Sequence, residues 1–487
     1  MLQNHDGALA DLLASGGDSR LDVDPRTGLN RYGCGFRPEP GLLHLGSCTG
    51  STVTEHGFDA AHDLLTAVTG SGGPAPTAMA SAHDDVRRRL KELLLPDGDP
   101  ADVVLTPSGT DAEYVTLDLA ARAGHPIVNI VTAPHEVGSG TVRAAGALHF
   151  DAITPNGSAR DAGTPVDADL ADRTSTVTVA VRRADGEARD ADDIDDEMRA
   201  LVERTLEGPS DVMVHVVAHS KTGMHAPTLG LLAELEHRFS DRLHVVVDAA
   251  QGRISRRGLR EALAAGRMVI VTGSKFYGGP PFSGAVLVPP RYRAAVQEGP
   301  PPTGFGDYFT AEQAPESWAA WRSALPAGGN LGLLLRWGAA IAEIERYYAV
   351  RPDLRFDVLC RFAARVPAVL DAVAGVELEE SPSTLLTDDA QRLLESKQTV
   401  FSFAVRGIPD AEGLRRVQAE LRRRSVGAES LPVQIGQPVT VRDDGTSLLR
   451  VALGAPLLSE FAAAPDPVAA IDEHLVVLAA RLEEVLA

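Results

Sequence analysis

The chain has 487 residues, of which 44% are hydrophobic and 23% are charged, which is an ordinary balance for a globular protein of two or three domains. Its formal net charge of −21 argues against a nucleic-acid partner or an anionic membrane surface, because the phosphates of both would repel it. No apolar run approaches the length of a membrane span, so no membrane partner is expected.

The N-terminal part is predicted to be irregular. Residues 1–80 are rich in Gly, Pro and Ser, which favours an N-terminal arm. Within this arm, residues 42–45 are apolar and residues 59–68 have helical spacing. An amphipathic helix at 82–95 then opens a larger domain, which we expect to extend over residues 81–335.

In the larger domain, short apolar runs alternate with helical patterns, as is typical of a mostly parallel α/β sheet. One helix is predicted at 111–123, and the acidic stretch 185–196 indicates an exposed loop that leads into another. Residues 299–306 form a Pro/Gly-rich connection. The predicted strands are 103–105, 127–132, 176–181, 212–218, 244–247, 268–271 and 284–288.

A long apolar-periodic helix at 331–349 is expected to bridge to a smaller α+β domain, 336–487. This domain is predicted to contain strands at 399–405 and 448–453, a helix at 411–424 and a closing helix from residue 467. The predicted fold class is therefore α/β, with a large domain around a parallel sheet of about seven strands and a small C-terminal domain.

Two charged residues follow neighbouring apolar strands. Asp248 comes directly after Val245–Val247, and Lys275 follows Met268–Val271 after one strand–helix–strand unit. The carboxyl ends of parallel strands meet at one edge of a sheet, so both side chains should emerge together. This pair is what pyridoxal 5′-phosphate (PLP) needs. The lysine forms a Schiff base with the aldehyde, and the acid keeps the pyridine nitrogen protonated.

Hydroxyl groups lie where a phosphate could bind. Ser108, Gly109 and Thr110 occupy a turn between a predicted strand and helix, where backbone N–H groups and hydroxyls can approach an anion at the positive end of a helix. Ser and Thr at this position are also ordinary helix caps. Thr272 and Ser274, just before the lysine, would add two hydroxyls to the same anion.

These motifs resemble those of fold type I PLP-dependent enzymes, and within them the class V aminotransferase and cysteine desulfurase family. The resemblance covers roughly residues 80–460. It rests on an ordered set of motifs, namely Ser108–Glu113, His135, Asp248–Gln251, Thr272–Gly278 and Leu449–Gly454.

The resemblance implies individual roles. Lys275 is the Schiff-base lysine, Asp248 contacts the ring nitrogen and Gln251 contacts the phenolic oxygen of the cofactor. His135 stacks on the pyridine ring, unless it is an ordinary surface histidine. Arg450 holds the carboxylate of an amino-acid substrate, unless it is paired with an acid of the protein.

A homodimer is also implied, because sites of this fold lie at a subunit interface. Arg322 and Ser323 resemble the segment that reaches the phosphate of the neighbouring subunit, although the usual hydroxyl-bearing residue is displaced.

The chain departs from the family pattern in several places. Ser220 stands where the family has an asparagine, and Ser274 replaces the histidine before the lysine. Desulfurases also need a loop cysteine before the arginine strand, and residues 426–437 contain none. A desulfurase that passes sulfur through a protein persulfide is therefore disfavoured.

The three cysteines have no metal-ligand spacing and cannot form a disulfide framework, which fits a reducing cytoplasm. No signal peptide is visible at the start, which points the same way. Cys360 lies in the helical pattern 354–366 and is expected to be a small core residue. Cys48 lies in the arm, which often borders the substrate pocket in this fold, but its spacing alone gives it no catalytic role.

The predicted activity is a PLP-dependent reaction of an amino acid, with transamination placed slightly ahead of carbon–sulfur or other Cβ elimination. Both reactions need the same motifs, and the stacking histidine favours the lyase. A nucleotide-binding protein is disfavoured because no Gly-x-Gly-x-x-Gly follows the first strand and no Gly-Lys-Ser/Thr occurs. Retention of Lys275, Asp248 and Gln251 argues against a catalytically inactive binding protein that keeps the fold.

Overall fold

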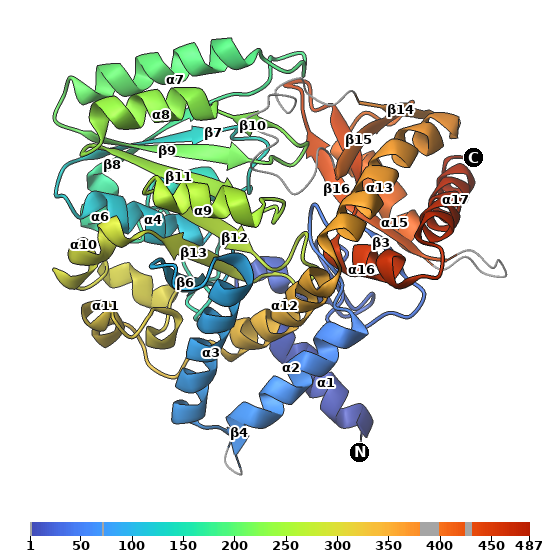
Figure 1. Cartoon of the computed structure of the whole chain (residues 1–487), viewed down its shortest axis with the longest axis horizontal. Helices are drawn as coiled ribbons and strands as arrows, with labels where there is room; N and C mark the ends of the chain where they lie inside the picture. The colour runs from blue at the N-terminus through green and yellow to red at the C-terminus, as the bar shows by residue number, and fades with distance from the viewer. Residues whose placement is uncertain (1, 71–72, 380–398, 424–430) are drawn as a thin grey trace.

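The computed structural model describes residues 2–70, 73–379, 399–423 and 431–487. The described residues form a larger part around one sheet and a smaller part around a second (Figure 1). No helix in these ranges is long and apolar enough to cross a membrane.

The large sheet has the strand order β6-β13-β12-β11-β9-β7-β8 and confirms the predicted α/β class. Neighbouring strands run parallel except at β13, which is antiparallel to both β12 and β6. The short β10 (His225–Ala226) adds an antiparallel pair to β9. The strands are β6 (Asp102–Thr106), β7 (Ile127–Thr132), β8 (Thr174–Val179), β9 (Asp211–Ala218), β11 (Leu243–Ala249), β12 (Met268–Thr272) and β13 (Gly284–Val288).

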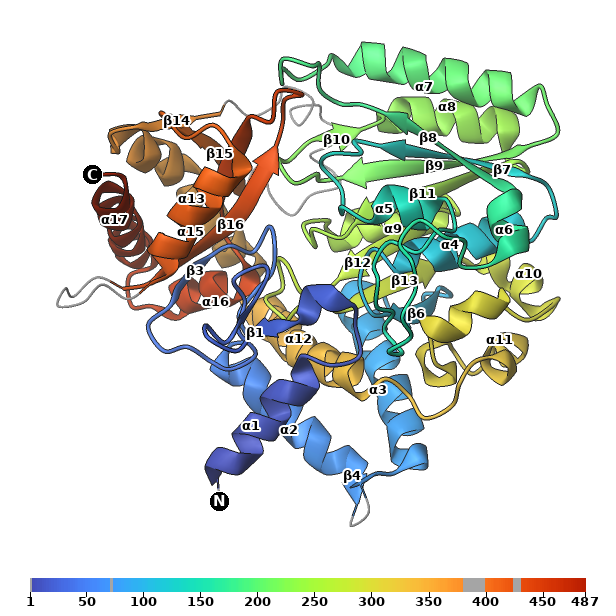
Figure 2. The ribbon, with the colours of Figure 1, turned by 180° about the vertical axis from the view of Figure 1, so that it is seen from behind.

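Helices cover both faces of this sheet, which is why its central strands read as continuous apolar runs. On one face Met198, Leu232 and Leu259 pack over Val214 and Leu105. These residues come from α7 (Ala191–Leu206), α8 (Leu229–Phe239) and α9 (Arg256–Ala264). The other face is covered by α4 (Ala112–Ala121), α5 (Thr141–Ala145) and α6 (Ala168–Asp172), as Figure 2 shows, together with α10 (Arg293–Gln297) and α11 (Ala319–Ala324).

The N-terminal segment is more regular than expected. Residues 2–13 form α1 (Leu2–Leu13), because Leu9 and Leu13 are buried in a cluster with Leu335 of α12 (Leu331–Ala349). The predicted helix at 59–68 is part of α2 (Glu55–Val68), and the one at 82–95 is part of α3 (Pro76–Leu94). The remaining short elements are η1 (Ser19–Leu21), β1 (Val23–Asp24), β2 (Leu29–Asn30), β4 (Thr69–Gly70) and β5 (Gly73–Pro74).

The small sheet has the order β14-β15-β17-β16-β3, and its edge strand β3 (Leu43–Leu45) comes from the N-terminal segment. β3 runs parallel to β16, with Leu43 paired to Val433. The other strands are β14 (Val376–Leu378), β15 (Val400–Val405), β16 (Val433–Thr440) and β17 (Ser447–Ala452). The helices are α13 (Pro352–Ala372), α15 (Ala411–Arg422), α16 (Ala455–Ala463) and α17 (Pro467–Leu486).

Two sequence-based predictions for the smaller part differ from the structure. Cys360 lies on α13 as predicted but is exposed, so it is not a core residue. The helix predicted at 411–424 ends at Arg422. Position 424 and residues 426–430 of the cysteine-free segment lie outside the described residues.

Candidate active site

The predicted pair meets at the carboxyl edge of the large sheet. Asp248 lies near the end of β11 and is paired in register with Ile270 of β12. Lys275 follows the end of β12, and because the two strands are parallel, both residues leave the sheet on the same side. Both line one cavity of about 360 Å³.

All of the predicted site residues line this cavity: Ser108, Gly109, Thr110, His135, Ser220, Asp248, Gln251, Thr272, Ser274, Lys275 and Arg450. The structure therefore brings together side chains that are far apart in the sequence. Arg322 and Ser323 do not line it. Arg322 donates to the carbonyl of Ala314, and the Ser323 hydroxyl donates to the carbonyl of Ala320.

Electrostatics prepare Lys275 for reaction with an aldehyde. Burial lowers the pKa of Lys275, Asp248 opposes this shift, Arg450 and Arg253 act with burial, and the resulting pKa is about 8. The uncharged amine, which is the form that attacks a carbonyl, is therefore far more abundant near neutral pH than for an ordinary lysine. Burial raises the pKa of Asp248, while Lys275 acts in the opposite direction.

A second acid lies behind Asp248. Glu113 of α4 is 1% exposed, and burial, followed by the charge of Asp248, raises its pKa well above the usual value. Its Oε2 lies 3.3 Å from Nδ1 of His215, whose own pKa is lowered by burial to about 3. Burial therefore favours the neutral forms of both Glu113 and His215, next to Asp248.

The hydroxyl turn, residues 108–110, also lines the cavity. The Ser108 hydroxyl donates to Asp111 Oδ2 at 2.5 Å and accepts the backbone N–H of Thr110 at 3.1 Å. A Cβ added to Gly109 would lie 3.2 Å from Cγ2 of Thr272, so glycine lets the turn approach the neighbouring strand end.

The two hydroxyls before the lysine differ in their environments. Thr272 donates to the carbonyl of Ala250 at 2.6 Å, which fixes its side chain. Ser274 is buried at the cavity wall, and its hydroxyl has no hydrogen-bond partner among the described residues. Ser274 is therefore the hydroxyl best placed to donate to a bound anion.

Gln251 is held by the N-terminal segment. Its Nε2 donates to the carbonyl of Cys48 at 3.1 Å, and its Oε1 accepts from Arg253 Nη1 at 3.0 Å. Arg253 also donates to Ser47 and to Thr399 of the smaller part. The amide is thus fixed where residues of both parts of the molecule meet.

Arg450 of β17 is 2% exposed but has no carboxylate within ion-pair distance among the described residues. Its guanidinium donates to the backbone carbonyl of Gln437 at 2.7 and 3.1 Å, to that of Lys221 at 3.2 Å and to the Thr49 hydroxyl at 3.0 Å. Neutral acceptors leave its full positive charge facing the cavity, where a substrate carboxylate would neutralise it.

One wall of the cavity depends on a buried acid. Glu136 is 3% exposed, pairs with Arg182 at 2.6 Å and accepts the hydroxyls of Ser220 and Thr222. The Ser220 hydroxyl therefore points toward Glu136 rather than donating into the cavity. His135, next to this acid, is exposed at the cavity rim.

A second lysine completes this wall. The Lys221 amine donates to the His135 carbonyl at 3.3 Å. Burial lowers the pKa of Lys221 to about 7, and the charges of Arg450 and Lys275 add to this effect. Lys221 is therefore a half-protonated amine close to the predicted reaction centre.

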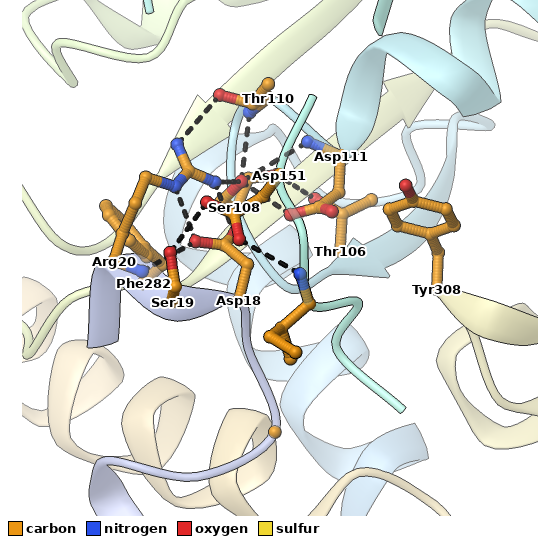
Figure 3. A network of polar contacts seen from close by, with 12 residues as sticks. Asp18, Ser19, Arg20, Thr106, Ser108, Thr110, Asp111, Asp151, Phe282 and Tyr308 are labelled. Carbon is orange, nitrogen blue, oxygen red and sulfur yellow. Dashed lines mark hydrogen bonds and ion pairs between the residues drawn. The ribbon is translucent and has the colours of Figure 1, made fainter. Parts of the chain in front are cut away.

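Sequence reasoning missed Arg20, Glu136 and Lys221. Arg20 lies in the N-terminal segment, and its guanidinium donates to the hydroxyls of Ser108 at 2.9 Å and Thr110 at 3.1 Å (Figure 3). No local pattern marks it. Lys221 comes three residues after the end of β9, so the rule that located Asp248, a charged residue close to the end of an apolar strand, could have found it.

The residues present fit PLP. An amine with a lowered pKa, a carboxyl group, a hydroxyl without a protein partner and an arginine without a protein carboxylate, all among the described residues, face one cavity. These groups match the aldehyde, the ring nitrogen and the phosphate of the cofactor and the carboxylate of an amino acid.

The sequence matches no family model and no curated protein. Solved structures share its fold. The cysteine desulfurase CsdA from Escherichia coli has a TM-score of 0.51 at 15% identity, over 91% of this chain and 95% of that chain. A lysine-to-alanine mutant of C-DES, with glycine covalently linked to the PLP cofactor, has a TM-score of 0.56 at 14% identity, over 91% of this chain and 97% of that chain. Apo cysteine desulfurase from Thermococcus onnurineus has a TM-score of 0.52 at 16% identity, over 91% of this chain and 94% of that chain. This likeness establishes the fold, fold type I of the PLP-dependent enzymes, as predicted.

Proposed function

We propose that this protein is a PLP-dependent enzyme that acts on an amino-acid substrate. The observation that carries the proposal is the placement of Asp248 and Lys275 at adjacent carboxyl ends of parallel strands, inside one cavity. The shared fold supports it, because the cysteine desulfurases and C-DES bear the same architecture.

Each residue has a defined task in this proposal. PLP supplies an electron sink for the bonds at Cα. Asp248 holds the proton on the pyridine nitrogen, and Lys275 binds the aldehyde and afterwards moves the proton at Cα. Arg450 orients the substrate through its carboxylate. Gln251, fixed by Cys48 and Arg253, is placed to donate to the phenolic oxygen.

Cβ elimination, including carbon–sulfur cleavage, is the reaction that we propose first. Expulsion of a group from Cβ is assisted by a proton donor, and Lys221, whose pKa is lowered by burial to about 7, is a second amine besides Lys275 at the cavity. A persulfide relay is not part of the proposal, because residues 426–437 contain no cysteine and Cys360 is exposed on α13 and does not line the cavity. Cys48 does line the cavity but is 1% exposed in the N-terminal segment. Transamination, which the sequence analysis placed first, uses the same residues and is the competing outcome.

The products separate these reactions. The protein is incubated with PLP and individual amino acids, with and without a 2-oxo acid. Elimination gives a 2-oxo acid and ammonia together with the group expelled from Cβ, which is sulfide when the substrate is cysteine, and it needs no added 2-oxo acid. Transamination instead transfers the amine to the added 2-oxo acid without releasing ammonia.

The covalent attachment is tested directly. Borohydride reduction followed by peptide mapping should place the PLP adduct on Lys275, and Lys275→Ala should abolish both adduct and turnover. Lys91→Ala is the matched control, because Lys91 lies on α3 and does not line the cavity. An adduct elsewhere, or none, would refute the proposed function.

A homodimer in the cytoplasm is proposed with the enzyme. Support for the dimer is the resemblance of the sequence to a family whose sites lie at a subunit interface. Support for the cytoplasm is that all three cysteines are free thiols. Sedimentation at several protein concentrations tests the dimer.

A further inference from the structure

The N-terminal segment carries a buried arginine to the hydroxyl turn. Arg20 lies in η1 and is 6% exposed, although arginine side chains are rarely buried. Asp18 holds it, with 2.7 Å from Nε to Oδ1 and 2.6 Å from Nη2 to Oδ2 (Figure 3). Two nitrogens of the fork are thereby fixed, and the guanidinium has a single orientation.

Two aromatic rings enclose the same guanidinium. Its central carbon lies 4.5 Å from the ring centre of Phe282 and 4.9 Å from that of Phe150. The segment itself is anchored beside Arg20, because the Ser19 hydroxyl donates to Asp151 at 2.7 Å. These contacts place the cation in advance, which lowers the entropic cost of using it to bind a ligand.

The donors of the guanidinium that do not bind Asp18 lie at the hydroxyl turn. Arg20 lines the cavity, and Nη1 and Nη2 reach the hydroxyls of Thr110 and Ser108. Other cations line the cavity, namely Arg31, Lys221, Lys275, Arg415 and Arg450. Of the lining cations, Arg20 alone has a hydrogen bond to the 108–110 turn among the described residues.

Asp18 is paired with Arg20, and the other charges near this pair do not make the cluster negative. Burial, followed by the charge of Asp18, raises the pKa of Asp111 to about 7, so a large fraction of this carboxyl is neutral near neutral pH. Arg336, buried behind the segment, adds positive charge near Asp18 and Asp111. An incoming anion therefore meets a cluster that is not negatively charged.

We propose that Arg20 binds the phosphate of the cofactor, together with Ser274 and the 108–110 turn, so that this chain supplies its phosphate-binding cation from its own N-terminal segment. The inference rests on the proposed function and names the phosphate monoester as the group recognised. Ser274 has a hydroxyl where the related family has a histidine, and Arg20 would supply a cation that Ser274 does not. The guanidinium would bind the phosphate through the N–H groups that now donate to Ser108 and Thr110, and a planar fork suits a phosphate better than a point charge does.

Comparison of PLP with pyridoxal, which lacks the phosphate, tests this role. Dissociation constants for both are measured by equilibrium dialysis on the full chain freed of cofactor, for the wild type, Arg20→Gln and Arg26→Gln. Arg26 is the matched control, because it lies in the same segment, is exposed and pairs with Asp24 outside the cavity. Unfolding temperatures are measured on the same samples.

Arg20→Gln should raise the dissociation constant of PLP by about 10- to 100-fold and change that of pyridoxal by less than about 2-fold. Arg26→Gln should leave both unchanged. Arg20→Lys keeps the charge but loses the planar fork, so it should raise the dissociation constant of PLP by an intermediate factor and leave that of pyridoxal unchanged. If Arg20→Gln does not fold, the comparison of Arg20→Lys with the wild type tests the proposal.

If binding of PLP and of pyridoxal is weakened equally, Arg20 only anchors the N-terminal segment. If the dissociation constant of PLP is unchanged, Arg20 does not contact the phosphate. Either result overturns the inference, but the proposed function still stands as long as the wild type binds PLP. A wild type that binds neither compound overturns both proposals.

Discussion

Asp248 opposes the lowering of the pKa of Lys275 that burial causes, and Arg450 and Arg253 act with burial. The acid thus controls how much of the amine is uncharged at a given pH. The pKa of Lys275 is about 8, so the amine is protonated below that pH and reactive above it.

This relationship predicts the pH dependence of cofactor attachment. The rate at which PLP attaches covalently should rise with pH and level off above about 8. In Asp248→Asn the main group that favours the charged amine is lost, so the midpoint should move to lower pH. Stopped-flow absorbance at a series of pH values measures both curves. A wild-type midpoint near the ordinary lysine value of 10.5 would contradict the lowered pKa of Lys275.

Asp248→Asn should also reduce turnover. Without a carboxylate the pyridine nitrogen is not kept protonated, and we expect kcat to fall by about 100-fold or more, as when a preorganised electrostatic contact is removed. PLP should still attach to Lys275, which distinguishes the loss from misfolding. Steady-state kinetics and absorbance on the same preparation provide the check.

Arg450→Lys should damage substrate binding. The lysine keeps the charge but cannot offer a planar fork, so kcat/KM should fall by about 10- to 100-fold, mostly through KM. The control is Arg416→Lys on α15, because Arg416 is exposed and pairs with Glu412 on the surface. An unchanged KM would show that another group holds the substrate carboxylate.

Lys221→Met should stabilise the empty protein near neutral pH. The pKa of Lys221 is lowered from 10.5 to about 7 in the folded state, so between these values the unfolded chain binds more protons than the folded one. This group therefore makes the free energy of unfolding rise with pH from about 7 to 10.5, and its removal should flatten that part of the curve. Urea unfolding at several pH values measures the difference. Lys91→Met, which removes a lysine outside the cavity, should leave the slope unchanged.

Glu136→Gln should destabilise the cavity wall. Glu136 accepts hydrogen bonds from Ser220 and Thr222 and pairs with Arg182, so neutralising it leaves a buried arginine without its partner. The expected cost is about 3 kcal/mol of unfolding free energy. Glu379→Gln is the matched control, because Glu379 lies 3.5 Å from the same arginine but is 34% exposed. Its removal should cost less than about 1 kcal/mol.

The central strands could be predicted because both faces of the sheet are buried. Residues 127–132 and 284–288 are largely apolar and match β7 and β13 residue for residue. β16 was missed since Gly436 and Pro438 interrupt its apolar pattern, and its partners come from distant parts of the chain. α1 was missed because its stability comes from packing of Leu9 and Leu13 against α12, which no local pattern reveals.

The site residues likewise separate into those that local sequence patterns predict and those that depend on tertiary packing. Asp248 and Lys275 could be placed together because each follows a strand, and parallel strands fix where such residues meet. The contact of Arg20 with Ser108 depends on how the N-terminal segment crosses between the two sheets (Figure 2), which spacing does not encode. The direction of the Ser220 hydroxyl, toward Glu136, likewise depends on tertiary packing.

The pairing of β3 with β16 has a consequence for synthesis. Leu43 leaves the ribosome long before its partner Val433 is made. The edge strand β3 therefore cannot dock until β16 has emerged, and contacts of such high sequence separation form slowly. A nascent chain halted before β16 would leave 43–45 without its neighbour, exposed to chaperones or to aberrant pairing with another copy.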